Sequence, residues 1–246
     1  MPSLASHLAG ARIVADRLGH RAIEASRGVF YLGATAPDLR SIERIPREQT
    51  HFYILDELGE QDPVARLLRA HPRLAAVDDL DVETRALMAG YITHLLMDQR
   101  YIEQVYRTYF GVASKLGGDA RADLLDRLLQ YELDRREREG EALAAVHAAM
   151  QDTSGAVDLG FVEREQLARW RDVAIQMASH PPSWDRWARI AQRHVPGETT
   201  EDTDSLLRDV PDLLREVLDH VTEDRLRAFM DESIEEATAR VKAYLG

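Results

Sequence analysis

Five residues within the first 100 positions have types and spacing that suit a metal site: His7, Asp38, His51, His94 and Asp98. The last two are four residues apart, so on a helix they project from the same face. An imidazole beside a carboxylate is a recurrent chelating unit for zinc and other divalent metals. The segment around this pair, ALMAGYITHLLM, is apolar almost throughout, and a buried charge there needs a compensating partner. A bound metal ion would supply that partner.

Each of the five residues also has a purely structural interpretation. His94 and Asp98 would form a buried hydrogen bond that only stabilises the helix core. His7 and His51 each share a helical stripe with apolar residues, and a lone histidine on such a face is more often a satisfied core residue than a ligand. Asp38 follows a proline, where an aspartate commonly caps a turn or a helix. It is the combination of residues that predicts a metal site.

The order and local context of these residues resemble the superfamily of bacterial zinc-dependent phospholipases C and fungal zinc nucleases. That family is all-α and carries a histidine near the mature N-terminus, a loop aspartate often written LGxxAPD, a histidine followed by an aromatic residue, and a helix with HxxxD. In this chain the loop reads LGATAPD up to Asp38, His51 precedes Phe52, and the HxxxD helix carries His94 and Asp98. The match covers roughly the first 110 residues.

The resemblance implies two metal sites. The first metal would be held by four side chains, those of Asp38, His51, His94 and Asp98. Asp98 would bridge to a second metal, which would also take His7 and the backbone of Met1, or of Pro2 if Met1 is removed. Zinc is the implied metal, with one or two ions bound. Asp38 is the implied base that orients the attacking water.

The family's third metal requires a histidine shortly after the HxxxD helix, and this chain has YIEQVYRTYF there. We therefore expect the third site to be absent or rebuilt. Glu132 and Asp134 would replace part of it if a long helix runs antiparallel to the HxxxD helix. The alternative, a solvated helical face continuous with RREREGE, is the more common role for such residues.

Arg40 lies two residues after Asp38, and its planar guanidinium suits a phosphate oxygen. Arg40 is therefore a candidate for binding the substrate. A salt bridge within the loop is the more common role for such a residue.

The elements that must position these residues are helices. Apolar residues recur at helical spacing almost everywhere, and runs of alternating Val, Ile and Thr are missing. The patterns predict helices over residues 4–18, 23–32, 50–58, 63–70, 82–110 and 119–150, followed by three or four more towards the C-terminus. We expect one compact all-α domain over residues 1–246, with the ligand motifs in residues 1–110, the helix of His94 at its centre, and the C-terminal helices completing the core.

Composition limits the function classes. The 246-residue chain has a formal net charge of −12 and a pI of about 5.2, which opposes stable binding to nucleic acid or anionic lipid without bound cations. It has no cysteine, so thiolate metal sites, disulfides and thiol catalysis are excluded. Neither a secretion leader nor an apolar run of membrane-spanning length is seen, which makes a cytoplasmic location the default expectation. The oligomeric state does not follow from the sequence.

These observations favour a metal-dependent hydrolase, most specifically a zinc-dependent phosphoesterase similar to phospholipase C. One or two zinc ions would lower the pKa of bound water to about 7 and polarise a phosphoryl oxygen. The expected substrate is a small-molecule or lipid phosphoester. Two alternatives stay open: a hydrolase of another small substrate with an altered metal cluster, and a noncatalytic helical protein with a structural metal site.

Overall fold

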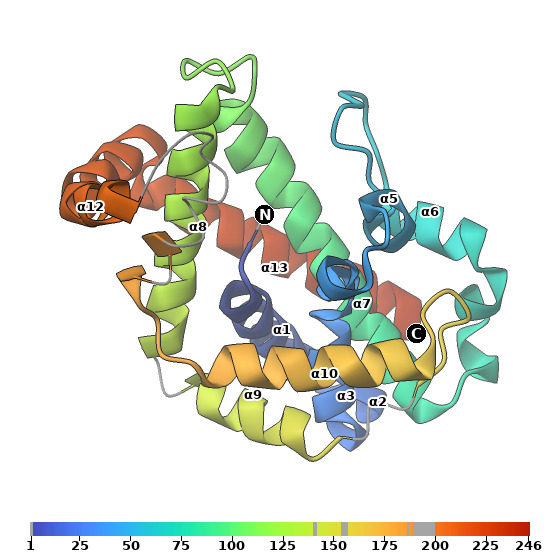
Figure 1. The fold of residues 1–246 in the computed structure, drawn as a ribbon. Coiled ribbons are helices and arrows are strands. Elements are labelled where there is room, and N and C mark those ends of the chain that lie inside the picture. The colour runs from blue at the N-terminus through green and yellow to red at the C-terminus, as the bar shows by residue number, and fades with distance from the viewer. Residues whose placement is uncertain (1, 140–141, 154–156, 186, 189–199) are drawn as a thin grey trace.

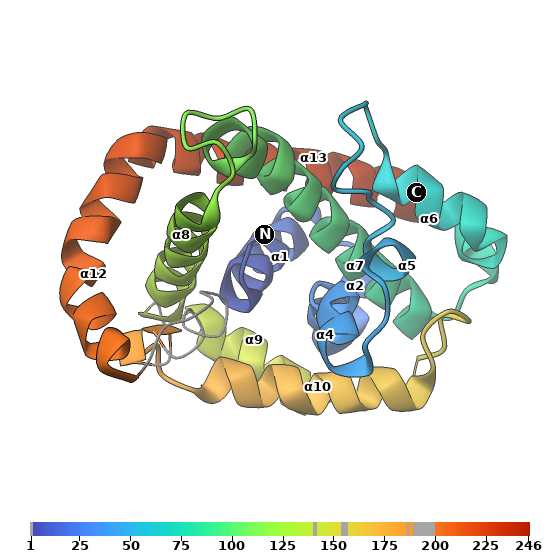
Figure 2. The same ribbon diagram turned by 45° about the horizontal axis from the view of Figure 1, so that its top comes forward.

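The computed structural model describes residues 2–139, 142–153, 157–185, 187–188 and 200–246. Helices make up nearly all of the regular structure in these residues, and no strand occurs among them, which confirms the all-α prediction. Helix α7 (Val82–Arg100) crosses the middle of the molecule, with α1 (Leu4–Leu18) and α3 (Arg27–Gly33) packed beside it and α13 (Glu223–Leu245) behind it (Figures 1 and 2).

Helix α7 is the core helix that the apolar pattern predicts. Asp81 caps its N-terminus by accepting a hydrogen bond from the backbone N–H of Thr84, and every residue from Ala86 to Asp98 is buried. The chain continues without a break into a wider π-helical segment, η4 (Tyr101–Phe110), which ends before Gly111. The predicted helix over residues 82–110 is therefore continuous, although its last third has a different helical geometry.

Helices α3 and α7 cross with their backbones in contact. A Cβ atom added at Gly90 would lie 1.9 Å from the carbonyl oxygen of Phe30, and one added at Gly33 would lie 2.0 Å from that of Leu87. Only glycine fits at both positions. Gly90 lies one turn before His94 on α7, and α3 fills the space that a side chain at Gly90 would occupy.

The N-terminal helices follow their sequence patterns in part. Helix α1 has the predicted bounds, begins after the capping side chain of Ser3, and ends at Gly19, whose φ of 53° is left-handed. The single helix predicted over residues 23–32 is wrong. The structure has α2 (Arg21–Ala25) and α3, separated by Ser26 at φ −147° and ψ 47°, which is not helical.

The helix predicted over residues 50–58 is also wrong. Helix α5 (Arg47–His51) ends just after His51, because Phe52 takes a left-handed conformation with φ 53° and closes the helix with a hydrogen bond from its N–H to Glu48. Apolar contacts support this strained backbone, since the ring of Phe52 packs edge-to-face against those of His71 and Phe161.

Shorter elements fill the rest of the N-terminal part. The loop of the LGATAPD motif contains η1 (Ala36–Leu39) and α4 (Arg40–Glu43). Helix α6 (Pro63–Ala70) has its predicted bounds and is followed by η2 (Pro72–Ala75) and η3 (Val77–Asp79).

The C-terminal part contains α8 (Ala120–Glu139), α9 (Ala142–Gln151), α10 (Arg164–Ser179), α12 (Thr200–Val221) and α13. The single helix predicted over residues 119–150 is wrong, because α8 and α9 run in different directions (Figure 1). Helix α8 packs against α1 and α12, whereas α9 packs against α3, α1 and α10. Among the described residues, no helix is long and apolar enough to span a bilayer.

Candidate metal centre

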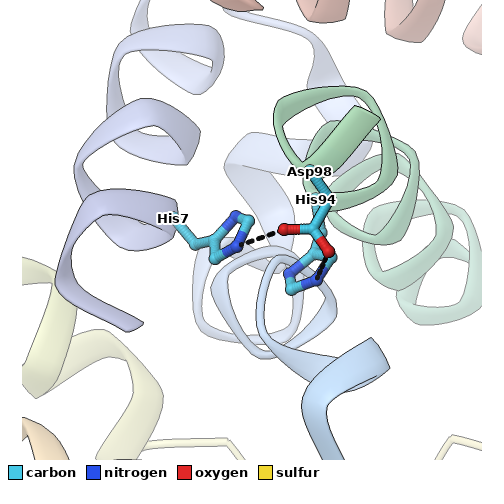
Figure 3. Close-up of side chains that lie close together, drawn as sticks. All are labelled: His7, His94 and Asp98. Atoms are coloured by element: carbon cyan, nitrogen blue, oxygen red, sulfur yellow. Dashed lines mark ion pairs between the residues drawn. The ribbon is translucent and has the colours of Figure 1, made fainter. Parts of the chain in front are cut away.

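Four separate segments bring the five predicted ligands together. Helix α1 supplies His7, η1 supplies Asp38, α5 supplies His51, and α7 supplies both His94 and Asp98. Figure 3 shows His7 facing Asp98 from the neighbouring helix, with His94 one turn away on α7. The side chains of His7, His51, His94 and Asp98 each expose 4% of their surface or less.

The distances between these side chains match the edges of a metal coordination polyhedron. The Nε2 atom of His51 lies 3.4 Å from Nε2 of His94, 3.3 Å from Oδ2 of Asp98, and 3.5 Å from Oδ1 of Asp38. Two ligand atoms that each lie about 2.0–2.1 Å from a tetrahedral zinc are about 3.3–3.4 Å apart. The spacing is therefore that of ligand atoms around one small cation.

The packing of α3 against α7 fixes the orientation of the His94 ring. The Nδ1 atom of His94 donates a hydrogen bond to the carbonyl oxygen of Ala34, at 2.9 Å. Ala34 directly follows α3, so the close helix crossing at Gly33 and Gly90 places this carbonyl beside the ring. Because Nδ1 carries the proton, Nε2 presents a lone pair to the centre, as metal-binding histidines require.

A hydrogen-bond chain within α5 orients His51 in the same way. The Thr50 hydroxyl donates to the backbone carbonyl of Arg47 at 3.4 Å, and it lies 2.9 Å from Nδ1 of His51. When the hydroxyl donates to Arg47, its oxygen accepts from Nδ1, and Nε2 is then left as an acceptor. The Tyr91 hydroxyl donates to the backbone carbonyl of Thr50 and so fastens α5 to α7.

The centre therefore gathers atoms that accept hydrogen bonds. Nε2 of His94 and the carboxylate oxygens of Asp38 and Asp98 all accept, and they lie 3.3–3.5 Å from Nε2 of His51. A proton or a cation between them is needed to make this arrangement favourable. Two groups of side chains, one of His7, His94 and Asp98 and one of Asp38, His51 and His94, could hold a metal ion.

The His7 side of the centre contains buried atoms without hydrogen-bond partners. Nε2 of His7 and Oδ1 of Asp98 lie 3.3 Å apart, yet neither makes a hydrogen bond of acceptable geometry. The ring of His7 stacks on that of His94 with centroids 3.8 Å apart and planes 13° from parallel. Buried polar atoms are rarely left unpaired, so this pair of atoms is a second position where a cation fits.

Arg47 belongs to the centre, although sequence reasoning did not select it. Its Nη2 atom donates to Oδ2 of Asp98 at 2.7 Å, and its side chain exposes 7% of its surface. The local sequence IPREQTHFY gives little indication of this role. A helix predicted over residues 47–51 would have indicated this role, because Arg47 and His51 lie four residues apart and share one helical face.

The surroundings of the two aspartates stabilise their charged forms. Burial alone would raise the pKa of Asp98, but the close contacts of its carboxylate with His94, His51 and His7 and the charge of Arg47 hold this pKa well below its usual value. Burial also acts to raise the pKa of Asp38, and its contacts with His51 and His94 outweigh burial and lower the pKa to about 2. Both carboxylates are therefore ionised, as metal ligands must be.

His94 is held in its neutral form. Burial lowers its pKa to about 3, and the neighbouring His7 acts in the same direction. A neutral imidazole is the form that binds metal. Asp38 differs from the other ligands because its side chain retains 29% of its exposure, so it forms the solvent-facing edge of the centre.

The remaining predicted residues lie elsewhere or outside the described part. Met1 is not among the described residues, so its predicted backbone ligand role lies outside them. Glu132 accepts hydrogen bonds from Arg135 and Arg136. Asp134 pairs with Arg138 and accepts a hydrogen bond from the backbone N–H of Ala5 at 3.0 Å. Neither belongs to the two side-chain groups of the centre.

Asp134 nevertheless supports the centre indirectly. The N–H of Ala5 is one of the free donors in the first turn of α1, and the carboxylate of Asp134 satisfies it across from α8. His7 lies two residues further along α1, so this contact helps to fix the helix that carries a predicted ligand. The antiparallel arrangement expected to bring α8 to the HxxxD helix instead brings α8 to α1.

Arg40 begins α4 and is partly buried, and its Nε atom has no hydrogen-bond partner. No ion pair of Arg40 occurs among the described residues, so the alternative of a loop salt bridge is not observed there. Its predicted contact with substrate remains a prediction.

A cavity of about 260 Å³ lies between the start of α1, α8 and the segment before Trp187. Its lining is mainly apolar and includes Leu4, Tyr131, Met177 and Trp187. None of the five ligands lines it, so this cavity is separate from the metal centre.

Comparison of the chain with protein-family models, with curated proteins and with solved structures finds no match. The resemblance to zinc-dependent phospholipases C and nucleases therefore rests on the motifs and on the arrangement of their residues.

Proposed function

We propose that the protein is a metal-dependent hydrolase that cleaves phosphoesters with one or two zinc ions bound at the centre. The observation that carries this proposal is the buried cluster in which Nε2 of His51 lies 3.4 Å from Nε2 of His94 and within 3.5 Å of carboxylate oxygens of Asp38 and Asp98. Neutral imidazoles with carboxylates form a typical ligand set for zinc, and they exclude the soft, thiolate-bound metals.

The chemistry divides between the metal and the chain. A bound zinc ion supplies a water with a pKa of about 7 and polarises a phosphoryl oxygen. Asp38 forms the exposed edge of the centre, where its free oxygen can orient the attacking water and accept its proton. The hydrogen bonds of His51 and His94 to Thr50 and Ala34 fix both rings before substrate arrives.

The exposure of Asp38 favours a hydrolase over a purely structural metal site. Structural zinc is closed by four protein ligands, whereas catalytic zinc keeps a position for water or substrate. One of the ligands here reaches solvent with 29% of its side chain, and the others are enclosed by helices. A small phosphoester, or the phosphate group of a lipid, would therefore approach the centre from the side of η1.

The test begins with the metal. Protein purified without chelator is analysed for its metal content and assayed against phosphomonoesters, phosphodiesters and phospholipids. We expect one or two zinc ions per chain and a hydrolytic activity that is lost with EDTA and restored by added zinc. His94→Ala protein serves as the control and should lack both metal and activity. Stoichiometric metal without hydrolysis of any of these substrates would instead support the structural metal site.

A further inference from the structure

Arg47 has more hydrogen-bonding capacity than the protein uses. Its Nη2 atom is committed to Asp98, but Nε and Nη1 are buried and have no hydrogen-bond partner. A buried guanidinium is stable only when its remaining protons are also satisfied. Two unpaired donors on one buried cation therefore indicate a ligand that accepts hydrogen bonds.

The position of Arg47 limits what that ligand can be. Nη2 donates to the same Asp98 oxygen that lies 3.3 Å from His51 and 3.8 Å from His94, so the guanidinium is adjacent to the metal ligands. Asp38, Asp98 and Arg47 together carry a net charge of minus one, and a single divalent cation reverses it to plus one. The centre then attracts an anion, and Arg47 is a charged donor beside the metal that could bind it.

We propose that Arg47 binds the phosphoryl oxygens of the substrate and of the phosphate product. The inference rests on the proposed function, because it requires a metal ion at the same centre. Asp98 holds one end of the guanidinium in place, and the free N–H groups donate to an oxyanion that also contacts the metal. A planar guanidinium suits this role better than an ammonium group, since its donors point in fixed directions.

The chain offers a competitor for the same role. Arg40 also has an unpaired buried Nε, and it lies two residues from Asp38. Its guanidinium, however, forms no hydrogen bond or ion pair with a predicted ligand among the described residues, whereas Arg47 is hydrogen-bonded to Asp98. Replacement of Arg47 should therefore weaken phosphate binding, whereas replacement of Arg40 should leave it unchanged.

The experiment measures binding of inorganic phosphate to zinc-loaded protein by isothermal titration calorimetry. The variants are Arg47→Gln, Arg47→Lys and Arg40→Gln. Arg100→Gln, which breaks an ion pair with Glu236 on the opposite side of α7 from Asp98, is the matched loss of charge. The metal content and melting temperature of each variant are measured first.

Removal of charge-assisted hydrogen bonds should weaken phosphate binding by about tenfold to a hundredfold in Arg47→Gln. Arg47→Lys keeps a positive charge beside Asp98 but loses the fixed directions of the guanidinium donors, so it should bind phosphate with an intermediate affinity. Arg40→Gln and Arg100→Gln should bind phosphate as the unmodified protein does.

Four outcomes would overturn the role of Arg47. Three of them are unmodified zinc-loaded protein that binds no phosphate, an affinity that falls in Arg40→Gln instead, and full affinity in metal-loaded Arg47→Gln and Arg47→Lys. Loss of metal from both Arg47 variants would also overturn it, because Arg47 would then only position Asp98. Phosphate binding that depends on Arg47 without any hydrolysis would sustain this inference and refute the proposed function.

Discussion

Two groups of buried carboxylates in this protein have opposite surroundings. The candidate metal centre contains Asp98, whose Oδ1 atom has no hydrogen-bond partner, beside a His7 ring with both nitrogens unpaired. The second group, here called the α8 cluster, consists of Asp126, Glu132 and Asp134. Their side chains expose little surface, and protein donors bind all three.

The α8 cluster shows what a buried acid looks like when the fold alone satisfies it. The Tyr101 hydroxyl donates to Asp126 at 2.7 Å, and the Gln130 amide donates to it at 2.6 Å. Burial raises the pKa of Asp126 despite these neutral donors, whereas contacts with imidazoles and Arg47 hold that of Asp98 well below its usual value. Burial of a carboxylate by itself therefore does not indicate a binding site. Buried atoms without hydrogen-bond partners, next to charged side chains, are the feature that indicates one here.

The largest effect that distinguishes the two groups should follow from replacing Asp98. Asp98→Asn removes a charge shared by both proposed metal positions and leaves Arg47 buried without its partner. We expect the free energy of unfolding to fall by about 3–5 kcal/mol. We also expect the variant to lose its stoichiometric metal. Urea unfolding and metal analysis measure these quantities.

The matched control is Asp126→Asn, which removes a buried acid of the α8 cluster. It should cost about 1 kcal/mol and leave the metal content unchanged. Equal losses of metal in Asp98→Asn and Asp126→Asn would contradict the assignment of the metal to the site of Asp98.

The second prediction concerns turnover. Asp38→Asn should keep at least one metal, because an amide oxygen can still coordinate, but the amide cannot accept a proton from water. We expect kcat to fall about 10²–10⁴-fold while zinc remains bound. Steady-state kinetics with the best phosphoester substrate and metal analysis on the same samples measure both quantities. Full activity in Asp38→Asn would remove Asp38 from the role of base.

The third prediction uses metal removal to separate the groups. Because ligands from four segments are joined at the centre, EDTA should lower the melting temperature. The stabilisation lost would be about 2.7 kcal/mol if free zinc had been at 100 times its Kd. Scanning calorimetry of His94→Ala should show a low melting temperature that EDTA does not change. Glu132→Gln, in the α8 cluster, should retain the full response to EDTA, and its failure to respond would contradict the assignment.

The smallest predicted effect is the pH dependence of the metal-free protein. The pKa of His94 is about 3 in the folded state and 6.5 in its unperturbed state. Between these two pH values the unfolded chain binds a proton that the folded protein does not. The contribution of neutral His94 to the free energy of unfolding is therefore fully present above pH 6.5 and declines as the pH falls. We expect the melting temperature to drop by roughly 2–6 °C between pH 6.5 and 5.

In His94→Gln this part of the pH dependence should disappear. A decline of the same size in the variant would assign the acid sensitivity to other groups.

Much of the fold follows from local pattern. The bounds of α1 and α6 agree with the apolar period and its capping residues, because a helix end depends on neighbours within a few positions. The predictions over residues 23–32, 50–58 and 119–150 fail because breaks occur inside helical patterns. At Phe52 the break is a left-handed residue held by aromatic rings from distant segments, which no local pattern reveals.

The sequence alone determined the types of the five candidate ligands and the pairing of His94 with Asp98, because a separation of four residues on a helix fixes a shared face. Only the tertiary structure decided that Arg47 joins them and that Glu132 and Asp134 are bound by other protein groups. The physical reason is distance. Helical periodicity fixes direction within one element, whereas hydrogen bonds and metal bonds of 2–3 Å require packing between segments far apart in the chain.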